Sequence, residues 1–192
     1  MRPYTGSTNG SEQPIDLAGC EGAYNQSIMT STEKRIEGAR LREIGLFGGL
    51  SDDVLDHFAK ALKSVRAIAG DIVFAEGDVA AREMFLILEG EVEILKKSRL
   101  GRAARVAILG NGDCFGEMSI IDMQARSATV RVLAPSLFVK ISSEDLDALY
   151  RRDLRSYVLI VLNIARDLSR RLRVANALLS NCSSGERDPG SP

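Results

Sequence analysis

Two short segments in the second half of the chain combine residue types that suit an anionic ligand. They are Phe115-Gly116-Glu117-Met118-Ser119 and Arg126-Ser127-Ala128-Thr129-Val130. A glycine lets the backbone approach a ligand closely, and the free N–H groups at the start of a helical turn bind anions. The Arg126 guanidinium can pair with two phosphate oxygens at once, which contributes about 1.5 to 3 kcal/mol in a partly enclosed site. The spacing therefore predicts a cradle for a phosphate group.

An acidic residue inside this cradle indicates a second ligand group. Glu117 cannot bind phosphate, because like charges repel, but its carboxylate can accept a hydrogen bond from a sugar hydroxyl. A ribose joined to the phosphate would satisfy both residues. A surface ion pair between Glu117 and Arg126 on a β-turn explains the same spacing equally well.

The composition excludes several classes of protein. The chain has 192 residues, 25 Lys and Arg against 26 Asp and Glu, and a net charge of -1, so no basic surface for nucleic acid is expected. Its longest apolar run, residues 157 to 162, is far shorter than the ~20 residues that span a bilayer. Three scattered cysteines and one histidine predict neither a metal site nor disulfides, and hence a cytoplasmic protein. Cys114 is expected to be a small buried hydrophobic residue.

The ends of the chain differ from its middle. Residues 1–29 are rich in Gly, Ser, Thr, Asn and Gln, and residues 181–192 are polar with two prolines, so both ends are predicted to be disordered. Residues 30–180 are predicted to fold as one domain. A capping-box spacing at 30–33 predicts a helix that ends at Gly48-Gly49, and a second helix starts at Ser51.

Between Val65 and Ile141, short β-branched and aromatic runs alternate with glycine-containing turns about every ten residues. This pattern of short apolar runs and regular turns predicts a small antiparallel β-sandwich or β-barrel. A strand is expected from Leu137 to Ile141, after Pro135. A second capping-box spacing, Ser142 to Asp145, then begins helical sequence that continues to about Ser180. The predicted class is α+β, with helices on both sides of an antiparallel β core.

The final helical segment carries two apolar rows at helical spacing. The first could be a seam for a second copy of the chain, which predicts a homodimer, although a wide face buried in a monomer is the alternative. The second row could face the β core. The rows are Leu154, Val158, Val161, Ala165, Leu168, Leu172, Ala175 and Leu179, and Tyr157, Ile160, Ile164 and Leu178.

From about Leu46 to Leu179 the chain resembles the cyclic-nucleotide-binding domain family of catabolite activator proteins, cyclic-nucleotide-dependent protein kinases and gated channels. The motifs are Gly70, Gly77-Asp78, Gly90 and the segments at 115–119 and 126–130. The resemblance implies a jelly-roll-like β-roll flanked by helices, with Glu117 on the ribose 2′-hydroxyl. It also implies that Arg126 and the N–H groups of Met118, Ser119 and Ala128 hold the cyclic phosphate, with Ser127 within reach. Together with Gly116, these residues form the phosphate-binding cassette that the resemblance implies, called the cassette below.

The resemblance to the catabolite activators extends into the final helix, where residues 169–176 resemble the stretch that contacts the base. Ala175-Asn176 stands where those proteins have Thr-Ser, and the Asn176 amide could serve adenine or guanine. Arg171 could lie near the ligand, although a solvated arginine is the favoured interpretation. Ile94, Val106 and Leu109 are expected to line the base pocket, although core packing would explain them as well.

Together these features predict a stand-alone receptor for cAMP, or for cGMP, that signals to an unidentified protein partner through helix rearrangement. No enzymatic activity, cofactor, metal, nucleic acid or membrane is expected, because only a polar tail follows the helix and the one histidine, His57, has no catalytic partner nearby in sequence. The alternative is an interaction or dimerisation module that ignores nucleotides, or a cyclic-dinucleotide binder, on the same fold.

Overall fold

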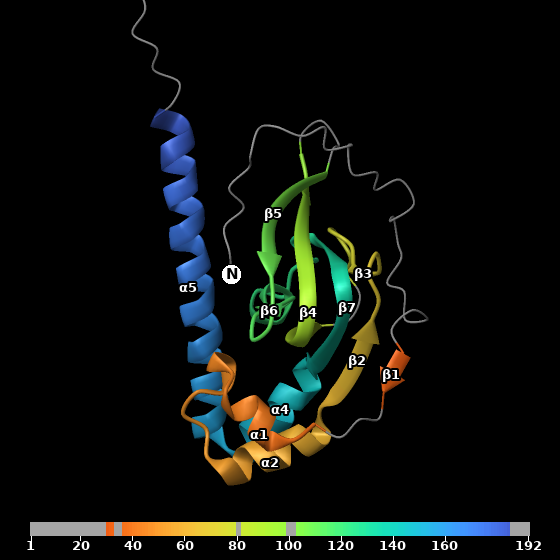
Figure 1. The fold of residues 1–192 in the computed structure, drawn as a ribbon. Helices are drawn as coiled ribbons and strands as arrows, with labels where there is room; N and C mark the ends of the chain where they lie inside the picture. The colour runs from red at the N-terminus through yellow and green to blue at the C-terminus, as the bar shows by residue number, and fades with distance from the viewer. Residues whose placement is uncertain (1–29, 33–35, 80–81, 99–102, 185–192) are drawn as a thin grey trace, which may run out of the picture.

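The computed structural model describes residues 30–32, 36–79, 82–98 and 103–184, with the backbone alone at 30–32 and 181–184. It confirms the α+β class: an antiparallel β-roll carries helices at one end and a long helix along one side (Figure 1). The segments 1–29 and 185–192, predicted to be disordered, lie outside the described residues. Within the described residues, none of the helices combines the length and hydropathy needed to cross a bilayer.

Among the described residues seven strands form the sheet, in the order β1-β2-β7-β4-β5, with β3 also paired to β7 and β6 to β4. These strand pairs are antiparallel, as the turn spacing predicted. The strands are β1 (Thr30–Thr32), β2 (Lys63–Ala67), β3 (Ile72–Phe74), β4 (Glu83–Lys97), β5 (Ala103–Leu109), β6 (Cys114–Phe115) and β7 (Thr129–Ser142).

The two long strands, β4 and β7, pair along their whole length and bend together at Gly90. There φ is +102°, and a Cβ atom would lie 2.1 Å from the Ser136 hydroxyl, so only glycine fits. The register between the two strands shifts on both sides of this point. Pro135, expected to precede a strand, lies inside β7 at the same irregular point, where the strand needs no N–H from it. The bend curls the sheet into a roll.

Alternation along β4 divides the core into two clusters. Phe85 and Ile87 point into the roll with Phe74, Phe115 and Phe138. Met84 and Leu86 point to the opposite face, where they meet the helices. Because successive side chains of a strand face opposite sides, one strand can serve both clusters. The roll therefore has its own aromatic interior, and the helices pack on the other face.

The helices are α1 (Gly38–Arg42), the 3-10 turn η1 (Gly45–Phe47), α2 (Asp52–Ala61), α3 (Met118–Ile121), α4 (Ser143–Arg152) and α5 (Leu154–Ser184). The predicted start of α2 at Ser51 and the capping box at Ser142 are confirmed. Asp153, which has extended backbone angles, separates α4 from α5. The helix expected to end near Ser180 continues to Ser184, so it takes in the first four residues of the predicted tail.

The predicted first helix is wrong in two respects. Thr30–Thr32, expected to cap it, instead forms β1 and pairs with Ser64–Arg66 of β2. Pairing with the edge strand β2 provides hydrogen-bond partners for the backbone of β1. Capping signals in the local sequence do not reveal such a distant partner. The remaining helical sequence divides into α1 and η1, because Ile44 adopts extended backbone angles between them.

A buried carboxylate ties three strands together on the outer face of the roll. Glu93 of β4 is fully buried and pairs with Arg105 of β5 and Arg131 of β7, whose side chains are 26% and 29% exposed. Removing one partner of a buried ion pair leaves an uncompensated charge, which costs about 3 to 5 kcal/mol when the pair is fully enclosed. This cluster holds β5 against the rest of the sheet.

We expect Glu93→Gln to lower the free energy of unfolding by about 2 to 3 kcal/mol, because the two partly exposed arginines would lose their shared carboxylate but regain some water. Urea denaturation measures the change. The matched control is Glu91→Gln, an exposed position on the same strand, which should shift the free energy by less than ~0.5 kcal/mol. Equal effects of the two substitutions would contradict a structural role for the cluster.

Candidate functional site

A sharp turn after β6 shapes the first segment singled out from the sequence. Gly116 has φ of +81°, and a Cβ atom there would lie 2.8 Å from Arg126 Nη1 and 3.0 Å from the Glu83 carbonyl oxygen. Glycine is therefore required both by the backbone angle and by the close approach of neighbouring groups. The short helix α3 follows at once, with its first residue, Met118, half exposed and Ser119 buried.

Arg126 is held in the interior by groups from several elements. It is only 4% exposed, and its Nη1 donates hydrogen bonds to Glu83 O (2.6 Å), Gly116 O (3.1 Å) and Ser119 Oγ (2.8 Å). Its guanidinium carbon lies 4.1 Å from the ring centroid of Phe74, within the range of a cation–π contact. The cation is thus fixed in place before any ligand arrives.

Glu117 is 3% exposed, and its carboxylate forms an ion pair with Arg171. Its Oε1 accepts a hydrogen bond from Arg171 Nη1 at 3.2 Å, whereas its buried Oε2 has no hydrogen-bond partner among the described residues. Burial raises the pKa of the Glu117 carboxyl, and the nearby Arg171 charge only partly opposes that effect. Because Glu117 and Arg126 are both buried, the interpretation as a surface ion pair on a β-turn is wrong.

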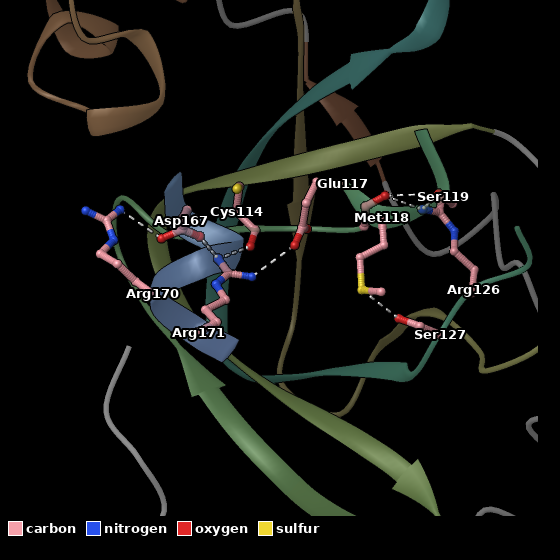
Figure 2. Close-up of polar contacts among 10 residues, drawn as sticks. Cys114, Glu117, Met118, Ser119, Arg126, Ser127, Asp167, Arg170 and Arg171 are labelled. Carbon is pink, nitrogen blue, oxygen red and sulfur yellow. Dashed lines mark hydrogen bonds and ion pairs between the residues drawn. The ribbon is translucent and has the colours of Figure 1, made fainter. Parts of the chain in front are cut away.

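Arg171 joins the helix α5 to this cassette (Figure 2). Its Nη2 donates to the Cys114 carbonyl oxygen at 2.6 Å and lies 2.6 Å from Asp167 Oδ2. Burial by itself lowers the pKa of this guanidinium, but Glu117 and other acidic neighbours raise the pKa by more than burial lowers it. The group therefore stays charged. The expectation that Arg171 is solvated is wrong, since its side chain is only 16% exposed.

The thiol of Cys114 lies beside these charges and is buried, as predicted. Burial, reinforced by the negative charge of Glu117, raises the pKa of this thiol to about 12. It is therefore protonated at neutral pH and packs as a small hydrophobic group.

These groups open onto one cavity of about 500 Å³, within the range of small-molecule sites. One side carries Glu117, Ser119, Arg126, Ser127 and Arg171, and the remainder of the wall is largely aliphatic. The full lining is Phe74, Ile94, Val106, Ala107, Leu109, Phe115, Gly116, Glu117, Met118, Ser119, Arg126, Ser127, Ala128, Val130, Leu168, Arg171, Leu172 and Ala175. A polar, charged end and an apolar end suit a ligand that is anionic at one end and flat and apolar at the other.

The structure brings together nearly all of the residues proposed from the sequence. The residues that line this cavity include all but one of those proposed: Ile94, Val106, Leu109, Gly116, Glu117, Met118, Ser119, Arg126, Ser127, Ala128 and Ala175. Asn176 is the exception: it is exposed and does not line the cavity of its own chain. One step along a helix turns a side chain by about 100°, so Ala175 and Asn176 cannot both face inward.

Sequence reasoning missed Phe74, Leu168 and Leu172 as lining residues and assigned Arg171 to solvent. A signal was present for the helix residues, because positions 168, 171, 172 and 175 share one face at spacings of three and four. An arginine on that otherwise apolar face needs a buried partner, and Glu117 supplies it.

Comparison with known proteins agrees with this geometry. The family described as "Cyclic nucleotide-binding domain" matches residues 65–153. The chain is 32% identical over 145 residues to the CRP-like cAMP-activated global transcriptional regulator of Mycobacterium tuberculosis, covering 73% of this chain and 61% of that protein. It is 32% identical over 114 residues to a cGMP-dependent protein kinase of Plasmodium berghei, covering 59% of this chain and 12% of the kinase.

A solved structure shows the same fold. A cyclic nucleotide-binding domain from Methylobacillus flagellatus superposes with a TM-score of 0.67 and 26% identity, covering 74% of this chain and 80% of that one. The chain thus spans about three fifths of the mycobacterial regulator and a small part of the kinase. The segment matched by the family contains the whole cassette and Arg126. This chain therefore carries a cyclic nucleotide-binding domain and belongs to that family.

Proposed function

We propose that this protein is a receptor for a 3′,5′-cyclic purine nucleotide, which it binds without chemical change. The observation that carries the proposal is the buried Oε2 atom of Glu117, which lines the cavity and has no partner among the described residues. A buried acceptor left unpaired costs about 1 to 3 kcal/mol, and a ribose hydroxyl would remove that cost. Arg126 supplies the positive charge for the cyclic phosphate at the same end of the cavity.

The aliphatic end of the cavity would take the base. Ile94, Val106, Leu109 and Ala175 offer apolar contact there, and a purine face buries well against such side chains. Similar proteins are named for cAMP and for cGMP, and the cAMP-activated regulator matches the larger share of this chain. We therefore place cAMP first and cGMP second.

Helix α5 would carry the signal. It contributes Leu168, Arg171, Leu172 and Ala175 to the cavity wall, so a ligand touches the helix directly. A ligand shifts α5 between two positions only as far as its affinities for those positions differ. The Glu117 to Arg171 pair is the contact through which an event in the cassette reaches α5.

The face of α5 turned away from the roll would form a homodimer seam. Ile160 and Ile164 are buried against the domain, as expected for the second apolar row. Along the first row Leu154, Val158, Val161 and Leu179 remain between 37% and 68% exposed, whereas Leu168, Leu172 and Ala175 of that row line the cavity. Exposed aliphatic side chains repeated at spacings of four and three suit a partner helix. A downstream protein partner would read the position of the paired helices.

Arg126→Ala should weaken cAMP binding by about tenfold or more, because the charge-assisted contacts to phosphate exceed the ~1.4 kcal/mol that equals a factor of ten. Isothermal titration calorimetry with cAMP and cGMP measures this. The control is Arg151→Ala, since Arg151 is 77% exposed on α4 and lies outside the cavity. Wild-type protein that binds neither nucleotide would refute the proposed ligand.

Binding should also depend on pH through Glu117. Burial raises the pKa of this carboxyl in the free protein above its ordinary 4.5, whereas a hydroxyl donor favours the ionised form. The ligand must then lower this pKa and release a proton, so affinity should rise with pH through the raised pKa and level off above it. Calorimetry from mildly acidic to mildly alkaline pH tests this, and Glu117→Gln should flatten the profile. A wild-type profile as flat as that of the variant would contradict the assignment.

Val158→Glu combined with Val161→Glu should convert a dimer to a monomer, because two charges would enter the proposed seam. Light scattering coupled to size exclusion gives the mass. The control is Ala177→Glu, which lies about 160° round the helix from Val161 and should leave the mass unchanged. A wild-type monomer at tens of micromolar would remove the dimer from the proposal.

A further inference from the structure

The three methionines among the described residues differ sharply in their access to solvent. Met84 is fully buried in the helix-facing core, Met118 is 42% exposed and Met123 is 66% exposed. Of these three, Met118 alone lines the cavity. Helix α3 therefore begins with a partly exposed methionine at the wall of the cavity.

The Met118 thioether is also joined to a polar residue of the same wall. The Ser127 hydroxyl donates a hydrogen bond to Met118 Sδ at 3.4 Å (Figure 2). Sulfur is a weak acceptor, so this bond leaves the hydroxyl easily redirected to a ligand oxygen. Ser127 directly follows Arg126, and both residues line the cavity at its charged end.

We propose that Met118 is an oxidation site at which a hydroperoxide switches the cavity to a state of low affinity for anionic ligands. The sulfur lone pair attacks one peroxide oxygen, an S–O bond forms and the O–O bond breaks, and the departing hydroxide takes the proton of the transferred oxygen to become water. The thioether is oxidised by two electrons to the sulfoxide, and hydrogen peroxide is reduced to water. Methionine sulfoxide reductases return the thioether, so the modification is reversible.

The sulfoxide changes the charged end of the cavity in two ways. Its oxygen is a much stronger acceptor than a thioether, so it retains the single hydroxyl proton of Ser127 that would otherwise reach a ligand oxygen. That oxygen also carries partial negative charge, and it would lie on the wall where an anion has to approach Arg126. Both effects lower the affinity for an anion, the second by repulsion.

The sulfur of Cys114, which lies in β6 beside the cassette, cannot take this role. Cys114 is buried and its pKa is raised to about 12, so it lacks the thiolate that reacts with peroxide. A thioether needs no deprotonation and depends mainly on access. Oxidation in this region is therefore directed to Met118 by exposure, not to the neighbouring thiol.

The test treats the full chain with hydrogen peroxide, maps sulfoxides by peptide mass spectrometry, and measures cAMP affinity before and after treatment of each protein. We expect sulfoxide at Met118 and Met123 but not at Met84, with a loss of affinity of about tenfold in the wild type. Met118→Leu should show no loss on treatment, whereas the matched control Met123→Leu should lose affinity as the wild type does. A sulfoxide reductase should restore the affinity.

Three results would overturn the proposal: unchanged affinity in wild-type protein fully oxidised at Met118, an equal loss in Met118→Leu, or an oxidation rate at Met118 as low as that at Met84. The affinity readout rests on the proposed function. If the untreated protein binds neither cAMP nor cGMP, that function fails on its own. The oxidation rate of Met118, which needs no ligand, then decides whether the site exists.

Discussion

The arrangement of the site depends on one buried carboxylate, that of Glu117. It lies within the domain at 3% exposure, where an unpaired charge would be very costly, and Arg171 provides the opposite charge from a helix more than fifty residues away in sequence. That pairing, together with the hydrogen bond from Arg171 to the Cys114 carbonyl, holds this part of α5 against the cassette. It leaves one carboxylate oxygen without a partner among the described residues, and this oxygen gives the cavity a specific demand for a hydrogen-bond donor.

The two arginines of the cavity have separate tasks because their surroundings differ. Arg126 is held by main-chain carbonyls, a serine hydroxyl and an aromatic ring, which fix its guanidinium at the cavity wall. Arg171 is engaged by Glu117 and Asp167 and links helix α5 to the cassette. In the proposed function, Arg126 attracts the anion and Arg171 couples the cassette to α5.

The β-roll makes this separation possible. Its aromatic interior supports Phe74 and Phe115 at the cavity wall, and its outer face anchors α5 through Ile160 and Ile164. Because β4 and β7 contribute to both faces, the position of the cassette and the position of the helix are set by the same two strands. The packing of the roll and the placement of α5 are therefore linked.

The sequence by itself determined the fold class, the antiparallel core, the capping box at Ser142 and the cassette residues, since these follow from local spacing, turn glycines and alternation. It also indicated the aliphatic positions Ile94, Val106 and Leu109. Only the tertiary structure decided the partner of Glu117, because Arg171 and Arg126 are equally plausible cations until the path of α5 is known. The same holds for Thr30–Thr32, whose strand depends on a distant sheet edge, and for Asn176, where one residue of helical register separates the cavity from solvent. Local sequence carries periodicity and capping, whereas pairings across long separations depend on how the whole chain packs.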